Sequence, residues 1–368
     1  MKVVRVRSPF IIDIGAYGST HIGSKIILTI WNNGAEPTVG QNGYYEFSKN
    51  NPSATQKETY YNVSNYVKEF IDNIKPTKIA SSPSYEDSNE WVNFRVKKSW
   101  YNGTIYTEIS NIQYVGVNGF TTYTQGLNAI QDYFTTGILT NKAISKNLLT
   151  SSSANKSYVN CIVDFLSAYR LEIIYVKLDL SFSFTVNITG LTGVKNLKIP
   201  MTTNNANFAL GNRLDMNLYD ATNAQVASDS VYVYVNDECK YTPVECTFIN
   251  RYGGWEFLTF FKAQTNSVSV KGTDYKLTQS AINYNTAIGQ FKTFNINGKQ
   301  TVKLNTGFVD ENYSELITDL LLSETVLLDS KPVTVKTQGS DLKTSLKDKL
   351  INYEMEFEYA YNLINDVV

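Results

Sequence analysis

Histidine is almost absent from this sequence, because His21 is the only one among 368 residues. Catalysis by a nucleophile with a histidine base would therefore depend on one residue, which lies between Thr20 and Ile22 after a glycine-rich turn. A structural role at the surface or in that turn is the expectation for His21, rather than general-base chemistry.

Cysteine is also scarce, with only Cys161, Cys239 and Cys246. Three widely spaced cysteines and one histidine do not match the ligand spacing of a zinc site, and they do not form a disulfide framework. Cys239 and Cys246 could face each other across a short loop. Free, buried thiols in a protein made in a cytosol are the favoured interpretation.

Motifs for phosphate, calcium and cofactors are missing as well. No GxxxxGK loop is present, and Gly253-Gly254 precedes a strand-like run rather than a helix, which indicates a turn between strands. Asp179, Asp215, Asp220 and Asp237 lack the close spacing of a calcium loop. The sequence therefore predicts no metal and no cofactor.

The chain has no excess of either charge, since 33 basic and 34 acidic residues give a formal net charge of -1. Such a balance creates no long-range field for nucleic acid, so no nucleic-acid partner is predicted. One small cluster of basic and aromatic residues is of the kind that binds nucleic acid: Trp91, Lys97, Lys98, Trp100 and Tyr101.

Long apolar runs are missing too. None approaches the roughly 18 residues of a membrane span, so no span is expected. The start, Met1 to Arg7, alternates like a strand and does not resemble a signal peptide. Synthesis in a cytosol, without secretion, is therefore the expectation.

Aromatic residues, by contrast, are abundant, with 26 tyrosines and 18 phenylalanines. These residue types favour β-strands and protein interfaces. Packing of β-sheet cores is the favoured interpretation, and an exposed aromatic binding surface is the alternative.

The clearest pattern is a strict alternation from Leu350 to Leu363. Apolar residues occupy the odd positions, and the even positions carry Glu354, Glu356 and Glu358. A period of two predicts a long strand with one buried face and one acidic, solvated face. A strand this long needs a large partner sheet, so the whole chain is expected to be mainly β.

Five Asn-Gly dipeptides indicate antiparallel hairpins, because both residues tolerate the positive φ of tight turns. They begin at Asn33, Asn42, Asn102, Asn118 and Asn297. If Asn102-Gly103 forms a two-residue loop, Trp100 faces Ile105, Val96 faces Ile109, and Lys97 faces Glu108 across the hairpin.

Helices are expected to be few, short and placed over sheets. Apolar spacing predicts one helix near 63–74, a brief one around Leu127, Ile130 and Phe134, and a third from Tyr313 to Leu321. The polar stretch 141–156 is predicted to be a linker or extended arm. Residues 159–169 remain ambiguous between helix and strand.

A second long alternation, with Ile174, Val176 and further apolar residues to Ile188 on one face, predicts the start of another β domain. The expected architecture is therefore antiparallel and β-sandwich-like. It has an N-terminal β-rich domain over 1–170 and a C-terminal β domain over 171–368, with a possible break near 250 and the terminal strand at 350–363.

Three glutamates on one strand face could serve as the paired carboxylates of a glycosidase. Neighbouring positions on a strand face are about 7 Å apart, which a distance criterion alone allows. Acidic alternation is much commoner as a solvated face that discourages edge-to-edge aggregation. No catalytic residue is predicted. Glu354, Glu356, Glu358, Trp100 and Tyr101 are instead candidates for an oligomer or partner interface.

Two blocks in the last third carry a resemblance to a known family. They are Phe248-Ile249-Asn250-Arg251-Tyr252-Gly253-Gly254-Trp255-Glu256 with Phe260-Phe261-Lys262, and Val333 to Thr337 with Leu346 to Asn362. These blocks resemble a structural protein family of tailed bacteriophages infecting Bacteroidetes, including crAss-like phages. The opening Arg7-Ser8-Pro9-Phe10 is similar to the start of such proteins. The resemblance implies a virion component of the neck or tail, without catalytic residues.

The leading hypothesis is thus a non-enzymatic virion protein that forms a closed ring or hub and docks to neighbouring phage tail or neck proteins. Long strands and extended arms suit such contacts. Two alternatives stay open: a tail-fibre module that binds carbohydrate through exposed Trp and Tyr, and a polysaccharide depolymerase.

Overall fold

A computed structural model of the chain describes residues 2–32, 34–72, 76, 79, 82–85, 90–128, 130–131, 138–149, 157–165, 169–238, 240–283, 285–339 and 351–365. The chain forms two compact units. The first contains residues 1–237 and 248–258, and the second contains 238–247 and 259–368. The expected division after residue 170 does not coincide with these units. The chain instead passes between them on either side of residue 250.

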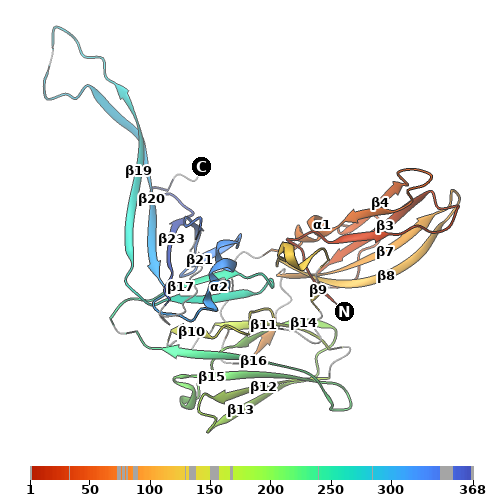
Figure 1. The fold of residues 1–368 in the computed structure, drawn as a ribbon. Coiled ribbons are helices and arrows are strands. Elements are labelled where there is room, and N and C mark those ends of the chain that lie inside the picture. Colours follow the sequence, from red (N-terminus) through yellow and green to blue (C-terminus); the bar gives the residue numbers. More distant parts are fainter. Residues whose placement is uncertain are drawn as a thin grey trace. The chain divides into compact units, whose positions relative to one another are not determined.

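The first unit is mainly β, as the sequence predicts (Figure 1). Its strands are β1 (Val3–Arg5), β2 (Ile11–Ile14), β3 (Gly23–Trp31), β4 (Tyr44–Asn50), β5 (Thr59–Asn62), β6 (Ser84–Tyr85), β7 (Trp91–Tyr101), β8 (Tyr106–Val117), β9 (Ile130–Gln131), β10 (Lys146–Leu149), β11 (Tyr158–Asp164), β12 (Arg170–Lys177), β13 (Ser183–Ile188), β14 (Val194–Pro200), β15 (Gly211–Tyr219) and β16 (Gln225–Asn236). Helical segments are α1 (Ser64–Lys68) and two 3₁₀ turns, Tyr123–Gln125 and Ala206–Phe208.

A six-stranded sheet, in the order β4-β3-β7-β8-β1-β9, forms the first layer of this unit. The β2–β5 pair and α1 contribute the other side of its core. Ile12 and Val67 from these elements belong to one buried cluster with Leu28 and Phe94 of the large sheet. Apolar residues on alternate positions of two facing layers give a sandwich-like core.

The same unit holds two further sheets, β10-β16-β15-β12-β13 and β11-β14-β6. Strand β11 resolves the ambiguous stretch in favour of a strand as far as Asp164, and all residues of β11 are buried. Residues 166–168 lie outside the described residues. The buried Tyr175 of β12 donates a hydrogen bond from Oη to the carbonyl oxygen of Pro200 in β14, at 2.7 Å. This contact joins the two sheets through a satisfied polar group.

The second unit contributes to a seven-stranded sheet in the order β18-β17-β21-β22-β23-β20-β19. Its elements are β17 (Val244–Ile249), β18 (Trp255–Phe260), β19 (Thr265–Lys276), β20 (Phe291–Asn305), α2 (Tyr313–Leu321), β21 (Val326–Leu328), β22 (Lys331–Val335) and β23 (Glu354–Tyr359). The helix expected from Tyr313 to Leu321 is confirmed as α2. Strands β17 and β18 pass from one unit to the other.

The hairpin at Asn102-Gly103 exists, but its predicted register is wrong. Tyr101 pairs with Tyr106, so the loop has four residues, and Trp100 pairs with Thr107. The Asn102 side chain accepts hydrogen bonds from the backbone N–H groups of Thr104 and Ile105, both at 2.9 Å, which stabilises the longer loop. A bulge after Lys98 shifts the pairing further. The predicted Lys97–Glu108 ion pair still forms, at 2.8 Å.

The Asn-Gly at Asn297 is not a turn, because Asn297 and Gly298 lie inside β20 opposite Lys271 and Val270. The Asn297 side chain donates to the carbonyl oxygen of Ile364 at 3.1 Å and accepts from its N–H at 3.0 Å. This amide therefore acts as a strand partner for the C-terminal segment.

The alternation over 174–188 is divided between β12 and β13, which form a hairpin. The chain reverses around Leu180, whose φ is 61°. The buried positions of β12 are Leu171, Ile173 and Tyr175, so the predicted inward face of Ile174 and Val176 is wrong. When both faces of a strand carry apolar residues, an alternation of period two does not show which face is buried.

Other local predictions are corrected in part. The helix near 63–74 is only α1, with Phe70 and Ile71 packed beside the core, and Ile74 lies outside the described residues. Around Leu127 and Ile130 there is strand β9 instead of a helix, and Phe134 lies outside the described residues.

The predicted arm over 141–156 is wrong across its first half. Strand β10 pairs in parallel with β16, and Ile144, Lys146 and Leu148 are buried. Residues 150–156 lie outside the described part of the chain. A buried lysine in this segment disguised the apolar alternation that surrounds it.

The terminal alternation is confirmed in its centre and shortened at its ends. Strand β23 covers Glu354–Tyr359, and Leu350 lies outside the described residues. Met355 and Phe357 are fully buried, whereas Glu354 and Glu356 are exposed. Strand β23 pairs with β20 on one side and β22 on the other, so its glutamates do not protect a sheet edge.

The two faces of β23 predict opposite responses to substitution. Phe357 meets Phe260 edge-on, with ring centroids 5.7 Å apart. Phe357→Ala should lower the free energy of unfolding of the second unit by about 3–5 kcal/mol, because it leaves a cavity. Glu356→Gln should change it by less than about 0.5 kcal/mol. Guanidinium unfolding followed by circular dichroism measures both, and similar losses for the two variants would contradict the assigned faces.

Candidate interaction surfaces

The exposed face of β23 is a ladder of alternating charge. Glu354 forms an ion pair with Lys303 at 2.8 Å. Glu358 forms ion pairs with Lys299 at 3.2 Å and with Lys336 at 3.1 Å. The lysines lie on β20 and just after β22, so they flank the glutamates from both neighbouring strands. Each exposed pair contributes at most about 1 kcal/mol to stability.

This ladder offers little to glycoside hydrolysis. The Lys336 ammonium is the main influence that holds the pKa of Glu358 below its usual range, despite the opposing effect of burial. A general acid needs a carboxyl group whose pKa is raised. The face therefore suits electrostatic contact with another surface better than proton transfer.

Trp100 and Tyr101 belong to a different unit from the three glutamates. They belong to the first unit and occupy adjacent positions of β7, so they point to opposite faces of its sheet. Trp100 stacks on Tyr17, with ring centroids 6.2 Å apart and planes 10° apart. Tyr101 stacks on Tyr106 at 4.5 Å. One face of the Trp100 ring is thus already covered, and the five predicted interface residues are divided between the two units.

His21 packs against the same aromatic group and is buried rather than at the surface, with 1% of its area exposed. Its Nδ1 accepts a hydrogen bond from the backbone N–H of Tyr17 at 3.2 Å, which confirms the structural role in the turn. Burial is the largest cause that lowers the pKa of His21. The backbone of Gly23 opposes this effect, and the charge of Lys57 adds to it.

A lowered pKa means that the folded protein binds fewer protons at His21 than the unfolded chain does. Stability from this group should be complete above the unfolded value of about 6.5 and be lost as pH falls through the folded value. Because the chain has one histidine, NMR titration of the imidazole gives its pKa directly. We expect a value below 6.5, and a value at or above 6.5 would contradict a neutral, buried His21.

The turn between β17 and β18 is organised by Asn250, which is 1% exposed. Its Oδ1 accepts hydrogen bonds from the N–H groups of Tyr252 at 2.9 Å and Gly254 at 3.2 Å. Gly253 has a φ of +84°, and a Cβ there would lie 2.7 Å from the Cβ of Val117. The turn therefore requires asparagine and glycine at these positions for structural reasons.

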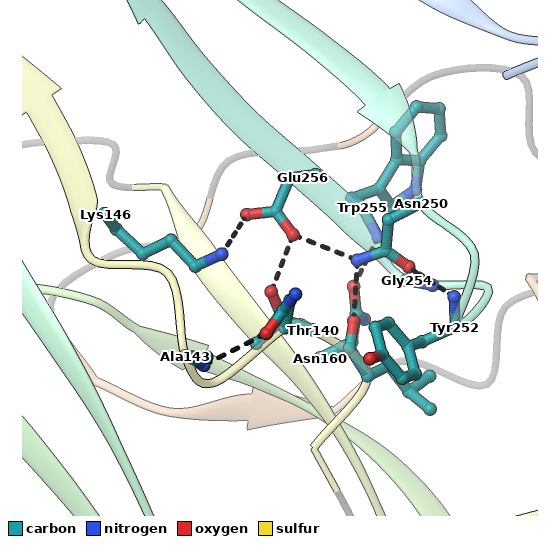
Figure 2. Close-up of polar contacts among 11 residues, drawn as sticks. Thr140, Ala143, Lys146, Asn160, Asn250, Tyr252, Gly254, Trp255 and Glu256 are labelled. Atoms are coloured by element: carbon teal, nitrogen blue, oxygen red, sulfur yellow. Dashed lines mark hydrogen bonds and ion pairs between the residues drawn. The ribbon is translucent and has the colours of Figure 1, made fainter. Parts of the chain in front are cut away.

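Figure 2 shows the polar cluster beside this turn, centred on the buried carboxylate of Glu256. Its Oε2 accepts hydrogen bonds from Thr140 Oγ1 at 2.6 Å and Asn250 Nδ2 at 3.0 Å. Its Oε1 lies 2.7 Å from Lys146 Nζ. The lysine and glutamate side chains are 1% and 2% exposed. Both oxygens of the Glu256 carboxylate have a partner and the group is closed to solvent, which fits a structural role.

The buried pair predicts a strong asymmetry between single and double substitutions. Lys146→Met should cost about 3–5 kcal/mol of stability, because it leaves the Glu256 charge buried without its partner. Adding Glu256→Gln removes that charge and keeps an acceptor for Thr140, so part of the loss should be recovered. Thermal unfolding of both variants tests this. A double variant that loses at least as much stability as Lys146→Met alone would argue against coupling.

The hairpin formed by β19 and β20 is exposed over most of its length. Every residue of β19 is exposed, as are those of β20 from Phe291 to Asn295. Within the second unit the hairpin extends beyond the other strands (Figure 1). It carries a series of exposed apolar side chains: Val268, Val270, Tyr275, Ile282, Ile288, Phe291, Phe294 and Ile296. A two-stranded ribbon with such side chains is marginal in water by itself.

A hollow of about 420 Å³ lies at the base of this hairpin, where the charge ladder ends. Its lining is polar: Ser269, Lys271, Asn295, Asn297, Gly298, Lys299, Lys336, Glu358 and Asn362. Of the predicted interface residues, Glu358 alone contributes to this wall. The sequence could not place the hollow, because its wall is assembled from segments far apart in the chain.

Metal binding finds no support in the described ranges, where no group of three or more potential ligands gathers. In the same ranges, no helix combines the length and apolar character needed to cross a membrane. Cys161 and Cys246 are buried, free thiols, as predicted, and burial raises the pKa of Cys161 to about 12. Cys239 lies outside the described residues.

Comparison of the chain with models of protein families gave no match, and comparison with curated protein sequences found no relative.

Proposed function

We propose that this protein is a non-enzymatic structural component of a phage virion, which builds a ring or hub of the tail or neck by self-association and by docking to other virion proteins. The observation that carries the proposal is the β19–β20 hairpin, which displays apolar side chains beyond the core of its own unit. Burial of such a ribbon against another chain would supply the support that it lacks in a monomer.

The resemblance to structural phage proteins, carried by 248–256 with 260–262 and by 333–337 with 346–362, supports the same proposal. Within those blocks, Asn250, Gly253 and Glu256 hold a turn and a closed polar cluster, as expected of residues that maintain a fold. A near-neutral, aromatic-rich chain also suits close packing of many identical copies, because like-charge repulsion between them is small. The site of action would be the virion after assembly in the host cytoplasm.

Shortening the hairpin tests the proposal. Replacement of residues 274–293 by Asn-Gly keeps the Thr273–Phe294 pair and joins the strands by a tight turn. The native chain should self-associate to a closed multiple of 41.5 kDa, measured by analytical ultracentrifugation. The shortened chain should remain folded and lose most of this association, because its apolar tip is gone.

Glu58→Gln is the matched control, since it changes an exposed carboxylate of the first unit, away from the hairpin and from the candidate interface residues, and should assemble normally. A native chain that stays monomeric at high concentration, or a shortened chain that assembles like the native one, would contradict the proposed role of the hairpin.

A further inference from the structure

The hollow at the base of the hairpin has a surplus of positive charge. Three lysines, Lys271, Lys299 and Lys336, line it together with one carboxylate, Glu358. Lys299 and Lys336 both lie within ion-pair distance of Glu358, which leaves the wall with two uncompensated positive charges. Such a wall suits a second anionic group with two negative charges.

The wall is held in shape by its own hydrogen bonds. Asn297 is fixed by two hydrogen bonds to the backbone of Ile364. The backbone N–H of Lys336 donates to the carbonyl oxygen of Glu356 at 2.8 Å, which fixes where that lysine leaves the sheet. These bonds fix the backbone positions from which the lysines project, so the positive charges stay close together even though the lysine side chains are exposed.

A matching acidic pair lies elsewhere on the same unit. Asp310 and Glu311 are adjacent, exposed and ahead of α2, and neither forms an ion pair with another described residue. Their backbone carbonyls accept hydrogen bonds from Tyr313 and Ser314, so the loop is ordered. Phe308 beside them is 66% exposed. Two carboxylates next to an exposed aromatic ring make a compact contact group.

We propose that the hollow of one copy binds the Asp310–Glu311 pair of a second copy. This inference rests on the proposed self-association and identifies the surfaces that it uses. Two different surfaces of the same chain then meet in a head-to-tail contact, which closes into a ring when the rotation between copies allows it. The exposed apolar hairpin above the hollow lies next to the same contact and adds buried area to it.

A simpler role for the acidic pair is stabilisation of the start of α2, because negative charge is favourable near a helix N-terminus. That role predicts a lower melting temperature when the charges of Asp310 and Glu311 are reversed by substitution with lysine. It predicts no rescue by changes in the hollow, so a charge exchange separates the two roles.

The experiment compares self-association of the full chain with that of four variants by analytical ultracentrifugation at low and high salt. Lys271→Glu with Lys336→Glu, and Asp310→Lys with Glu311→Lys, should each weaken association at least tenfold at low salt. All four changes in one chain should restore it to within about threefold of the native chain. Lys271→Gln with Lys336→Gln should weaken association by an intermediate amount. This variant replaces the charge reversal if Lys271→Glu with Lys336→Glu does not fold.

Lys2→Glu with Lys331→Glu is the control, because it makes the same change of net charge at exposed lysines that do not line the hollow. Native association that resists every reversal would overturn the assigned contact and leave the proposed function standing. If the variant with all four changes associates no more strongly than either double variant, the assigned contact is also overturned. A native chain that does not associate would overturn both proposals.

Discussion

The buried carboxylate of Glu256 is the constraint on which the centre of the first unit depends. An ionised group in the interior is tolerated only when it is paired and hydrogen-bonded, and Glu256 has Lys146, Thr140 and Asn250 as partners. Residues 248–258 belong to the first unit, while the chain on both sides of them belongs to the second. The closed cluster therefore anchors the segment through which the chain enters and leaves the first unit.

Much of the fold could be predicted from period and turn chemistry. Alternation located β23 and its buried Phe357, and apolar spacing located α2, because each pattern has one face that must be buried. Predictions failed where local patterns were ambiguous. Both faces of β12 carry apolar residues, so the alternation alone did not show which face is buried, and the wrong one was chosen. In the β7–β8 hairpin, a bulge after Lys98 shifted the strand register from the predicted one.

The candidate surfaces were harder to predict, because they depend on long-range pairing. Glu354 and Glu356 were placed correctly on an exposed face, whereas Glu358 is half-buried. The lysine partners of Glu354 and Glu358 come from β20 and from the segment after β22. Lys146 gave no signal of its burial opposite Glu256, since a lysine in a polar stretch usually indicates a solvated loop. The exposed hairpin was not predicted, because Asn297-Gly298 is a typical turn dipeptide but here lies within strand β20.

Charge and apolar area together give the second unit its proposed role. A charge ladder leads along β23 to a cationic hollow, and an apolar ribbon begins at the same place. Polar complementarity selects the partner and its orientation, whereas apolar burial supplies most of the affinity. A structural protein in a repeating assembly needs both properties on one surface.

Quantitative mass spectrometry of purified phage particles tests the central claim most directly. The proposed virion role predicts that this chain is present at a fixed copy number relative to the other particle proteins, as a closed ring or hub requires. Its absence from intact particles, with the protein found only in the soluble fraction of infected cells, would contradict a structural role in the virion.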